Sequence, residues 1–76
     1  LELAPNDATA YSNRGEIHRE LGDYQKAVAD STKALELNLE HPKVYITRGA
    51  AYVSLGDLQR ALADFDRAIE LNPNEA

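Results

Sequence analysis

Apolar side chains recur at helical spacing in four segments of the chain. Residues 24–37 and 58–71 follow the i, i+3, i+4, i+7 pattern that places apolar side chains along one side of an amphipathic helix. The apolar positions are Tyr24, Ala27, Val28, Ala34, Leu35 and Leu37 in the first segment and Leu58, Ala61, Leu62, Phe65, Ala68, Ile69 and Leu71 in the second. A similar stripe is formed in 8–21 and 42–55 by Tyr11, Gly15, His18 and Leu21 and by Tyr45, Gly49, Tyr52 and Leu55. No segment alternates as a strand would, so the pattern predicts an all-α protein with helices near these four ranges.

Residues that favour turns separate the four segments. Gly-Asp pairs stand at 22–23 and 56–57, where Gly can take the left-handed conformation that ends one helix and Asp can cap the next. Asn38 and Asn72 are expected to close the second and fourth helices in the same left-handed way. The residues expected to begin helices are Asp7, as a cap, and Pro42, as the first helical residue. The chain is therefore expected to form two helical hairpins.

The two hairpins are copies of one sequence unit. Residues 8–41 and 42–75, laid in register at a period of 34 residues, share 14 identical positions. These are Tyr11/Tyr45, Arg14/Arg48, Gly15/Gly49, Leu21/Leu55, Gly22/Gly56, Asp23/Asp57, Gln25/Gln59, Ala27/Ala61, Ala29/Ala63, Asp30/Asp64, Ala34/Ala68, Glu36/Glu70, Leu37/Leu71 and Asn38/Asn72. A fixed period of this length indicates stacked copies of one unit, and it favours an extended binding surface over a catalytic pocket.

These residues resemble the tetratricopeptide repeat, a helix–turn–helix unit with the pattern W-x2-L-G-x2-Y…A-x3-F…P. The second copy reads Tyr45-x2-Arg48-Gly49-x2-Tyr52, then Ala61-x3-Phe65, Ala68 and Pro73. The first reads Tyr11-x2-Arg14-Gly15-x2-His18, then Ala27-x3-Ser31, Ala34 and Leu39. The opening residues align with the ends of both copies, so 1–7 looks like the remnant of a preceding repeat. The resemblance implies an α-solenoid of two repeats, at 8–41 and 42–75, each an antiparallel helix pair.

Two glycines and two arginines interrupt the predicted helices. Each glycine costs about 1 kcal/mol relative to Ala inside a helix, so the recurrence of Gly15 and Gly49 indicates that two helices approach closely there. Arg14 and Arg48 stand where the motif has Leu. They could bind a ligand, but we prefer ion pairs with the aspartates that recur on the opposing helices, at 30 and 64, because a charge near a core is normally paired.

The resemblance also implies a binding groove, because the first helix of each repeat lines the concave face in this family. The corresponding residues are Thr9, Ser12, Asn13, Glu16, Arg19 and Glu20 in the first repeat and Lys43, Ile46, Thr47, Ala50, Val53 and Ser54 in the second. They form a polar half and a half with an apolar strip. Such a face can bind a peptide or can simply be solvated, and the exposed apolar strip favours binding.

Asn13 and Lys43 have a more specific interpretation. Some members of the family hold the C-terminal carboxylate of a peptide with an Asn from one repeat and a Lys and an Arg from the next. Asn13 and Lys43 match those positions, but Thr47 replaces the Arg. Because Asn is also common there without any such clamp, we favour the interpretation in which no clamp exists.

Composition excludes several classes of function. The net charge of −5 argues against a nucleic-acid partner, which would require clustered Lys and Arg. The chain has no Cys and no apolar run of roughly 20 residues, so thiol chemistry and a membrane span are not expected. We find no catalytic triad, phosphate-binding loop or metal motif, and therefore expect no enzyme activity and no cofactor. The first residues do not read as a signal peptide, and a cytoplasmic protein is expected.

Charge is spread unevenly, because 8–21 and 42–55 sum to +2 while the remaining segments carry −7. A groove lined by the first helices should therefore be less acidic than the outer face and could admit acidic peptides.

We expect a non-catalytic scaffold that binds a partner protein or peptide in its groove. The alternative is a structural or oligomerisation segment of a longer array with no dedicated ligand. Leu62, Phe65 and Ile69 lie on a face that a following repeat would cover, so self-association through the open repeat ends is also expected.

Overall fold

Four helices make up most of the chain in the computed structural model, which describes residues 7–72. They are α1 (Ala8–Glu20), α2 (Tyr24–Glu36), α3 (Pro42–Leu55) and α4 (Leu58–Leu71). Each helix predicted from the periodicity is confirmed, with ends that agree within one residue, and residues 7–72 contain no strand. The expected repeat remnant at 1–7 lies outside the described residues, apart from Asp7.

The helix starts follow the capping residues in the sequence, with one exception. Asp7 accepts a hydrogen bond from the Ala10 backbone N–H at 3.0 Å, and Asp57 accepts one from the Arg60 N–H at 3.3 Å. Asp23 makes no such bond to α2, so its expected capping role is wrong. Before α3, the His41 ring nitrogen Nδ1 accepts from the Lys43 N–H at 3.1 Å, a cap that the sequence pattern did not indicate.

Left-handed residues end three of the four helices. Gly22 and Gly56 have φ values of 86° and 84°, and Asn38 has φ of 72°. Gly and Asn tolerate this conformation with the least steric cost, which explains the choice of residue at these turns. Asn72 differs, since its φ of −147° is extended, so the left-handed closure expected for α4 is wrong.

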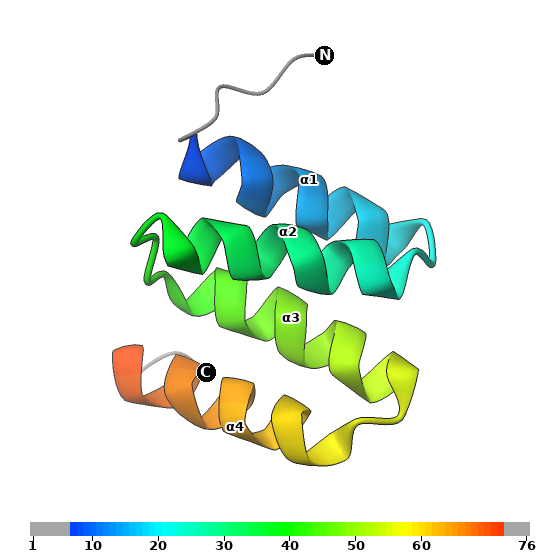
Figure 1. The fold of residues 1–76 in the computed structure, drawn as a ribbon. Coiled ribbons are helices and arrows are strands. Elements are labelled where there is room, and N and C mark those ends of the chain that lie inside the picture. Colours follow the sequence, from blue (N-terminus) through cyan, green and yellow to red (C-terminus); the bar gives the residue numbers. More distant parts are fainter. Residues whose placement is uncertain (1–6, 73–76) are drawn as a thin grey trace.

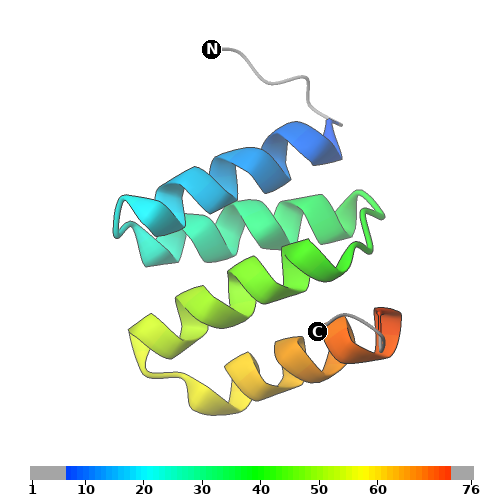
Figure 2. The same ribbon diagram turned by 180° about the vertical axis from the view of Figure 1, so that it is seen from behind.

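The four helices stack in chain order, and each runs antiparallel to its predecessor (Figures 1 and 2). Helix α1 packs on α2 and α3 packs on α4, which gives the two predicted hairpins. Between the hairpins, α2 packs on α3 and α1 also contacts α3, whereas α2 and α4 do not touch. The first helices of both hairpins, α1 and α3, are therefore neighbours, while the second helices are not, as an α-solenoid requires.

Small residues form the centre of each hairpin. The buried apolar side chains are Ala27, Ala34, Val44, Ala51, Ala61 and Ala68. A Cβ atom on Gly49 would lie 2.9 Å from Cε1 of Phe65, and one on Gly15 would lie 3.2 Å from Cβ of Asp30. Both distances are shorter than van der Waals contact, which confirms that helices approach closely at the two glycines.

The loop between α2 and α3 is tied to α4 through Glu40. Its Oε1 accepts hydrogen bonds from the Tyr45 hydroxyl at 2.9 Å and from Nη2 of Arg67 at 3.3 Å. The Tyr45 hydrogen bond, followed by that of Arg67, lowers the pKa of the Glu40 carboxyl below its ordinary value of 4.5. Because the folded chain holds the carboxylate more strongly than the unfolded chain, Glu40 stabilises the fold above that ordinary pKa and loses this effect as the pH falls below it.

We therefore expect Glu40→Gln to lower the urea midpoint at neutral pH and to have almost no effect in acid. Unfolding curves of the parent and the variant, recorded at both pH values, measure this difference. Glu36→Gln is the matched control, because Glu36 is exposed and forms no ion pair within residues 7–72. A Glu40→Gln effect of equal size at both pH values would contradict the assignment.

Candidate peptide-binding groove

A bidentate ion pair fixes each first helix to its second helix. Arg14 donates from Nε and Nη2 to the Asp30 carboxylate at 2.7 and 2.9 Å, and Arg48 donates in the same way to Asp64 at 2.9 and 2.8 Å. These hydrogen bonds raise the pKa of both guanidinium groups. The preference for structural ion pairs is confirmed, because Nε and Nη2 of both arginines already donate to an aspartate.

Aromatic rings flank both guanidinium groups. The Arg14 guanidinium carbon lies 5.7 Å from the ring centre of Tyr11, and that of Arg48 lies 5.8 and 5.9 Å from the ring centres of Tyr45 and Tyr52. These distances suit cation–π attraction. They explain how Arg can replace Leu in the apolar stripe without leaving an unpaired charge.

Helices α1 and α3 lie side by side, and an ion pair connects them across the candidate groove. Nζ of Lys43 lies 2.9 Å from Oε2 of Glu16. Both residues belong to the predicted groove set. Lys43 is therefore already paired, which makes it a weaker ligand for a peptide carboxylate than the clamp interpretation would require.

Most of the predicted groove residues reach the surface. Thr9, Asn13, Glu20, Lys43, Ile46, Val53 and Ser54 are exposed, and Ser12, Glu16, Arg19 and Ala50 are half-buried. Thr47 is 5 % exposed and shares the buried side of α3 with Val44 and Ala51. The placement of Thr47 on the open surface is therefore wrong, because residues three and four positions apart on a helix face the same neighbour.

An aliphatic strip follows α3 on its open side. Ile46 is 43 % exposed and Val53 is 47 % exposed, with Ala50 half-buried between them. The three residues are four and three positions apart, so they share one side of the helix over two turns. The equivalent positions on α1 are Ser12, Glu16 and Arg19, which are polar.

Two cavities lie on either side of the start of α3. One, of about 190 Å³, is lined by Thr9, Ser12, Asn13, Leu39, His41, Lys43 and Val44. The other, of about 390 Å³, is lined by His41, Pro42, Lys43, Ile46, Leu71 and Asn72. Four predicted groove residues meet in the first cavity and two in the second. His41 and Lys43 line both, and the sequence pattern gave His41 no place in the groove because it lies in the loop before α3 rather than on a first helix.

The charge of the candidate groove is lower than the helix sums suggest. Arg14 and Arg48 both contributed to the +2 of the first helices, but they form ion pairs with Asp30 and Asp64 and do not belong to the groove set. The charged residues that remain in the groove set are Glu16, Arg19, Glu20 and Lys43, whose charges cancel. The set is thus less acidic than the chain as a whole, and it is neutral.

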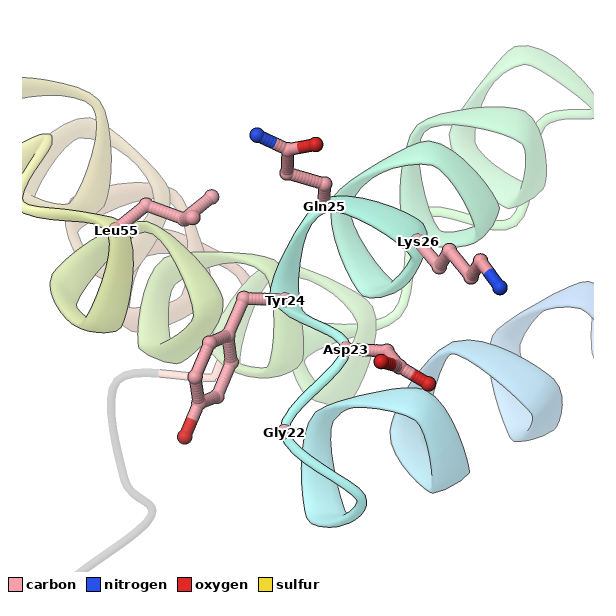
Figure 3. Close-up of a pocket in the computed structure, with 6 residues that line it drawn as sticks. All are labelled: Gly22, Asp23, Tyr24, Gln25, Lys26 and Leu55. Carbon is pink, nitrogen blue, oxygen red and sulfur yellow. The ribbon is translucent and has the colours of Figure 1, made fainter.

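A further depression, of about 290 Å³, lies at the opposite end of the first helices. Figure 3 shows that Gly22 and Asp23 line it from the α1–α2 turn, and that Leu55 comes from the end of α3. Tyr24, Gln25 and Lys26 line it from the start of α2. The Asp23 carboxylate turns toward α1, where Oδ2 lies 3.8 Å from Nδ1 of His18. This orientation explains why Asp23 does not cap α2.

The family model of the tetratricopeptide repeat matches residues 6–74. The chain belongs to the tetratricopeptide repeat family. Repeats of this family are generally non-catalytic modules of protein–protein interaction, and the helix pairs and helix order of the fold agree with the assignment.

The relatives with the same repeats are longer proteins. A tetratricopeptide repeat protein 36 homolog from Nematostella vectensis is 44 % identical over 41 residues, which cover 54 % of this chain and 23 % of the relative. SGT1 homologs from Oryza sativa subsp. japonica and Bos taurus are 45 % and 53 % identical over 38 residues, which cover 50 % of this chain. The matched segment spans only 10 % and 11 % of those two proteins.

Residues 7–72 contain no group of three or more His, Asp or Glu side chains placed to hold a metal ion. No helix within these residues has the length and apolarity needed to cross a membrane.

Proposed function

We propose that this tetratricopeptide-repeat chain, with repeats at 8–41 and 42–75, binds a partner peptide or helix in the groove along α1 and α3. The observation that carries the proposal is the exposed aliphatic strip of Ile46, Ala50 and Val53. Removing exposed apolar area from water favours association by roughly 25 cal/mol per Å². An aliphatic strip on the concave side of a repeat protein therefore suits an apolar ligand face.

The polar half of the groove would fix the orientation of the ligand. Thr9, Ser12 and Asn13 offer hydroxyl and amide groups around one cavity, next to the Lys43–Glu16 pair. Because the groove set is neutral and polar there, hydrogen bonds rather than net charge would select the ligand. The ligand expected from this lining has aliphatic side chains toward α3 and hydrogen-bonding groups toward α1.

The second candidate function is structural. The open side of α4 exposes Leu58, Leu62 and Ile69 by 64, 62 and 61 %, more than the groove strip. A segment that serves only as a spacer or assembly unit would use this face and leave the groove empty.

A peptide selection separates the two functions. Peptides selected from a random display library against the immobilised chain are expected to lose at least about tenfold in affinity for the Ile46→Ser, Val53→Ser double variant, since two buried aliphatic contacts are removed. Fluorescence anisotropy of the selected peptides measures the change. Both positions are half exposed, so the fold should persist, which circular dichroism checks.

The control is Leu62→Ser, Ile69→Ser, which removes the same number of exposed aliphatic side chains from α4. Under the groove proposal, this control binds the selected peptides as the parent does. Selected peptides that bind the groove variant undiminished but lose affinity for the control would refute the groove proposal and support the structural function.

A further inference from the structure

The two ends of the stack expose the same surfaces that are buried where the two hairpins meet. On α3, Ala51 is completely buried, while its equivalent on α1, Ile17, is 55 % exposed. On α2, Val28 and Leu35 are half-buried, while their equivalents on α4 are more than 60 % exposed. We call the exposed side of α1 around Ile17 the α1 face and that of α4 around Leu62 and Ile69 the α4 face.

A hydrogen bond within the chain shows how such faces recognise each other. Nη1 of Arg48, on α3, donates to Oγ1 of Thr32, on α2, at 3.1 Å. This is the third hydrogen bond of the Arg48 guanidinium, because its Nε and Nη2 already donate to the Asp64 carboxylate. Arg48 therefore links its own hairpin to the preceding one while its side chain is only 19 % exposed.

The equivalent donor on α1 and the equivalent acceptor on α4 have no partner within residues 7–72. Arg14 uses Nε and Nη2 for Asp30 and leaves Nη1 unused, with 48 % of its side chain exposed. The residue equivalent to Thr32 is Asp66, which is exposed on α4 and forms no ion pair with a described residue. An unused donor on one face thus matches an unpaired acceptor on the other, and the acceptor is charged.

We propose that the α4 face of one chain binds the α1 face of a second copy, with Arg14 of that copy donating to Asp66. The junction repeats the packing of α2 on α3, with Ile17 of the second copy placed against Leu62 and Ile69. The guanidinium–carboxylate contact replaces the guanidinium–hydroxyl contact of the internal junction. The carboxylate adds attraction between opposite charges to the hydrogen bond and allows shorter contacts than a hydroxyl does, so the contact favours this orientation.

This association adds to the groove. The second copy places its α1 beside α3, as α1 and α3 lie within one chain. Its polar residues Thr9, Ser12 and Asn13 would then border the strip of Ile46 and Val53 on the side that is open in a single chain. The inference does not depend on groove binding, because the faces involved are those of α1 and α4.

Two complementary variants test the orientation. Ile17→Glu blocks the α1 face and Leu62→Glu blocks the α4 face, and both positions are more than half exposed. In sedimentation equilibrium, the parent chain is expected to grow in mean mass with concentration beyond a dimer, because a head-to-tail contact does not close. Each variant alone should remain a monomer. An equimolar mixture should form a 1:1 dimer through the two unblocked faces, which also shows that both variants are folded.

A third variant tests the ion pair. Asp66→Asn is expected to weaken self-association of the parent chain by about tenfold and to reduce its dependence on salt. Asp57→Asn, which changes a carboxylate outside the proposed contact, is the control for net charge.

The proposal is overturned if the parent chain stays monomeric at all concentrations or if the mixture of blocked variants does not dimerise. Self-association of Ile17→Glu alone would also overturn it, because that result indicates α4 packing on α4. Undiminished peptide binding by Ile17→Glu in any of these cases would leave the groove proposal intact.

Discussion

Replacing Asp64 with alanine is expected to destabilise the chain by about 3 kcal/mol, because it leaves the Arg48 guanidinium unpaired where water reaches it poorly. Asp64 is 4 % exposed and the Arg48 side chain 19 % exposed, and two hydrogen bonds of 2.9 and 2.8 Å join them. A domain of this length has a total stability of roughly 4–11 kcal/mol. Urea unfolding followed by circular dichroism should therefore show a large fall in the midpoint.

The same substitution in the first repeat is the internal control. Asp30 holds Arg14 in the same bidentate way, but the Arg14 side chain is 48 % exposed. Water can hydrate the freed guanidinium there, so Asp30→Ala should destabilise the chain less than Asp64→Ala. Equal losses for the two variants would contradict burial as the cause.

Replacing both partners separates the penalty of an unpaired charge from the value of the pair. Arg48→Met combined with Asp64→Leu leaves no buried charge, and such exchanges are often neutral or stabilising. The double variant should therefore be more stable than Asp64→Ala alone. If the double variant were as unstable as Asp64→Ala, the ion pair itself would supply the stability, and the penalty of an unpaired guanidinium would not be the cause.

The sequence predicted the helices because their local signals agree. Apolar spacing, the turn glycines and Pro42 all place the four helices where the structure has them, within one residue. The ion pairs were also predictable, since an arginine in an apolar stripe and an aspartate on the opposite helix recur together at one period. The predicted side-chain cap at Asp23 and left-handed turn at Asn72 were wrong, because a residue type permits such a cap but does not determine that it forms. At Asp23, the carboxylate turns toward His18 on α1 instead.

The groove was less predictable because it depends on contacts between the hairpins. Thr47 occupies the position of Asn13 in the next repeat, yet Thr47 is buried and Asn13 is exposed. The difference in burial arises from the neighbouring helix, because α3 packs on α2 whereas α1 has no described helix before it. The Lys43–Glu16 pair was missed for the same reason, because a period of 34 relates equivalent residues and does not show which unlike residues meet.

Gly49→Ala is expected to destabilise the chain by up to about 2 kcal/mol, although alanine is the better helix former. The added Cβ would lie 2.9, 3.1 and 3.2 Å from Cε1, Cζ and Cδ1 of the Phe65 ring, so the ring must shift. Overpacking of this kind costs about 1–3 kcal/mol, against a gain of about 1 kcal/mol in helix propensity. The steric cost is therefore expected to exceed the gain, and urea unfolding measures the difference.

The Phe65→Ser background should reduce this effect. The first repeat already combines a glycine with a serine, since Ser31 stands at the position of Phe65, and a Cβ on Gly15 would still lie 3.2 Å from Oγ of Ser31. Without the ring, the added methyl at position 49 meets no aromatic atoms, so its steric cost should fall toward the gain of about 1 kcal/mol in helix propensity. A double-mutant cycle over the two positions measures the coupling, which should be large because the atoms are in direct contact. If Gly49→Ala destabilises both backgrounds equally, the ring is not the obstacle, and the glycine would be required by the approach of the α3 and α4 backbones themselves.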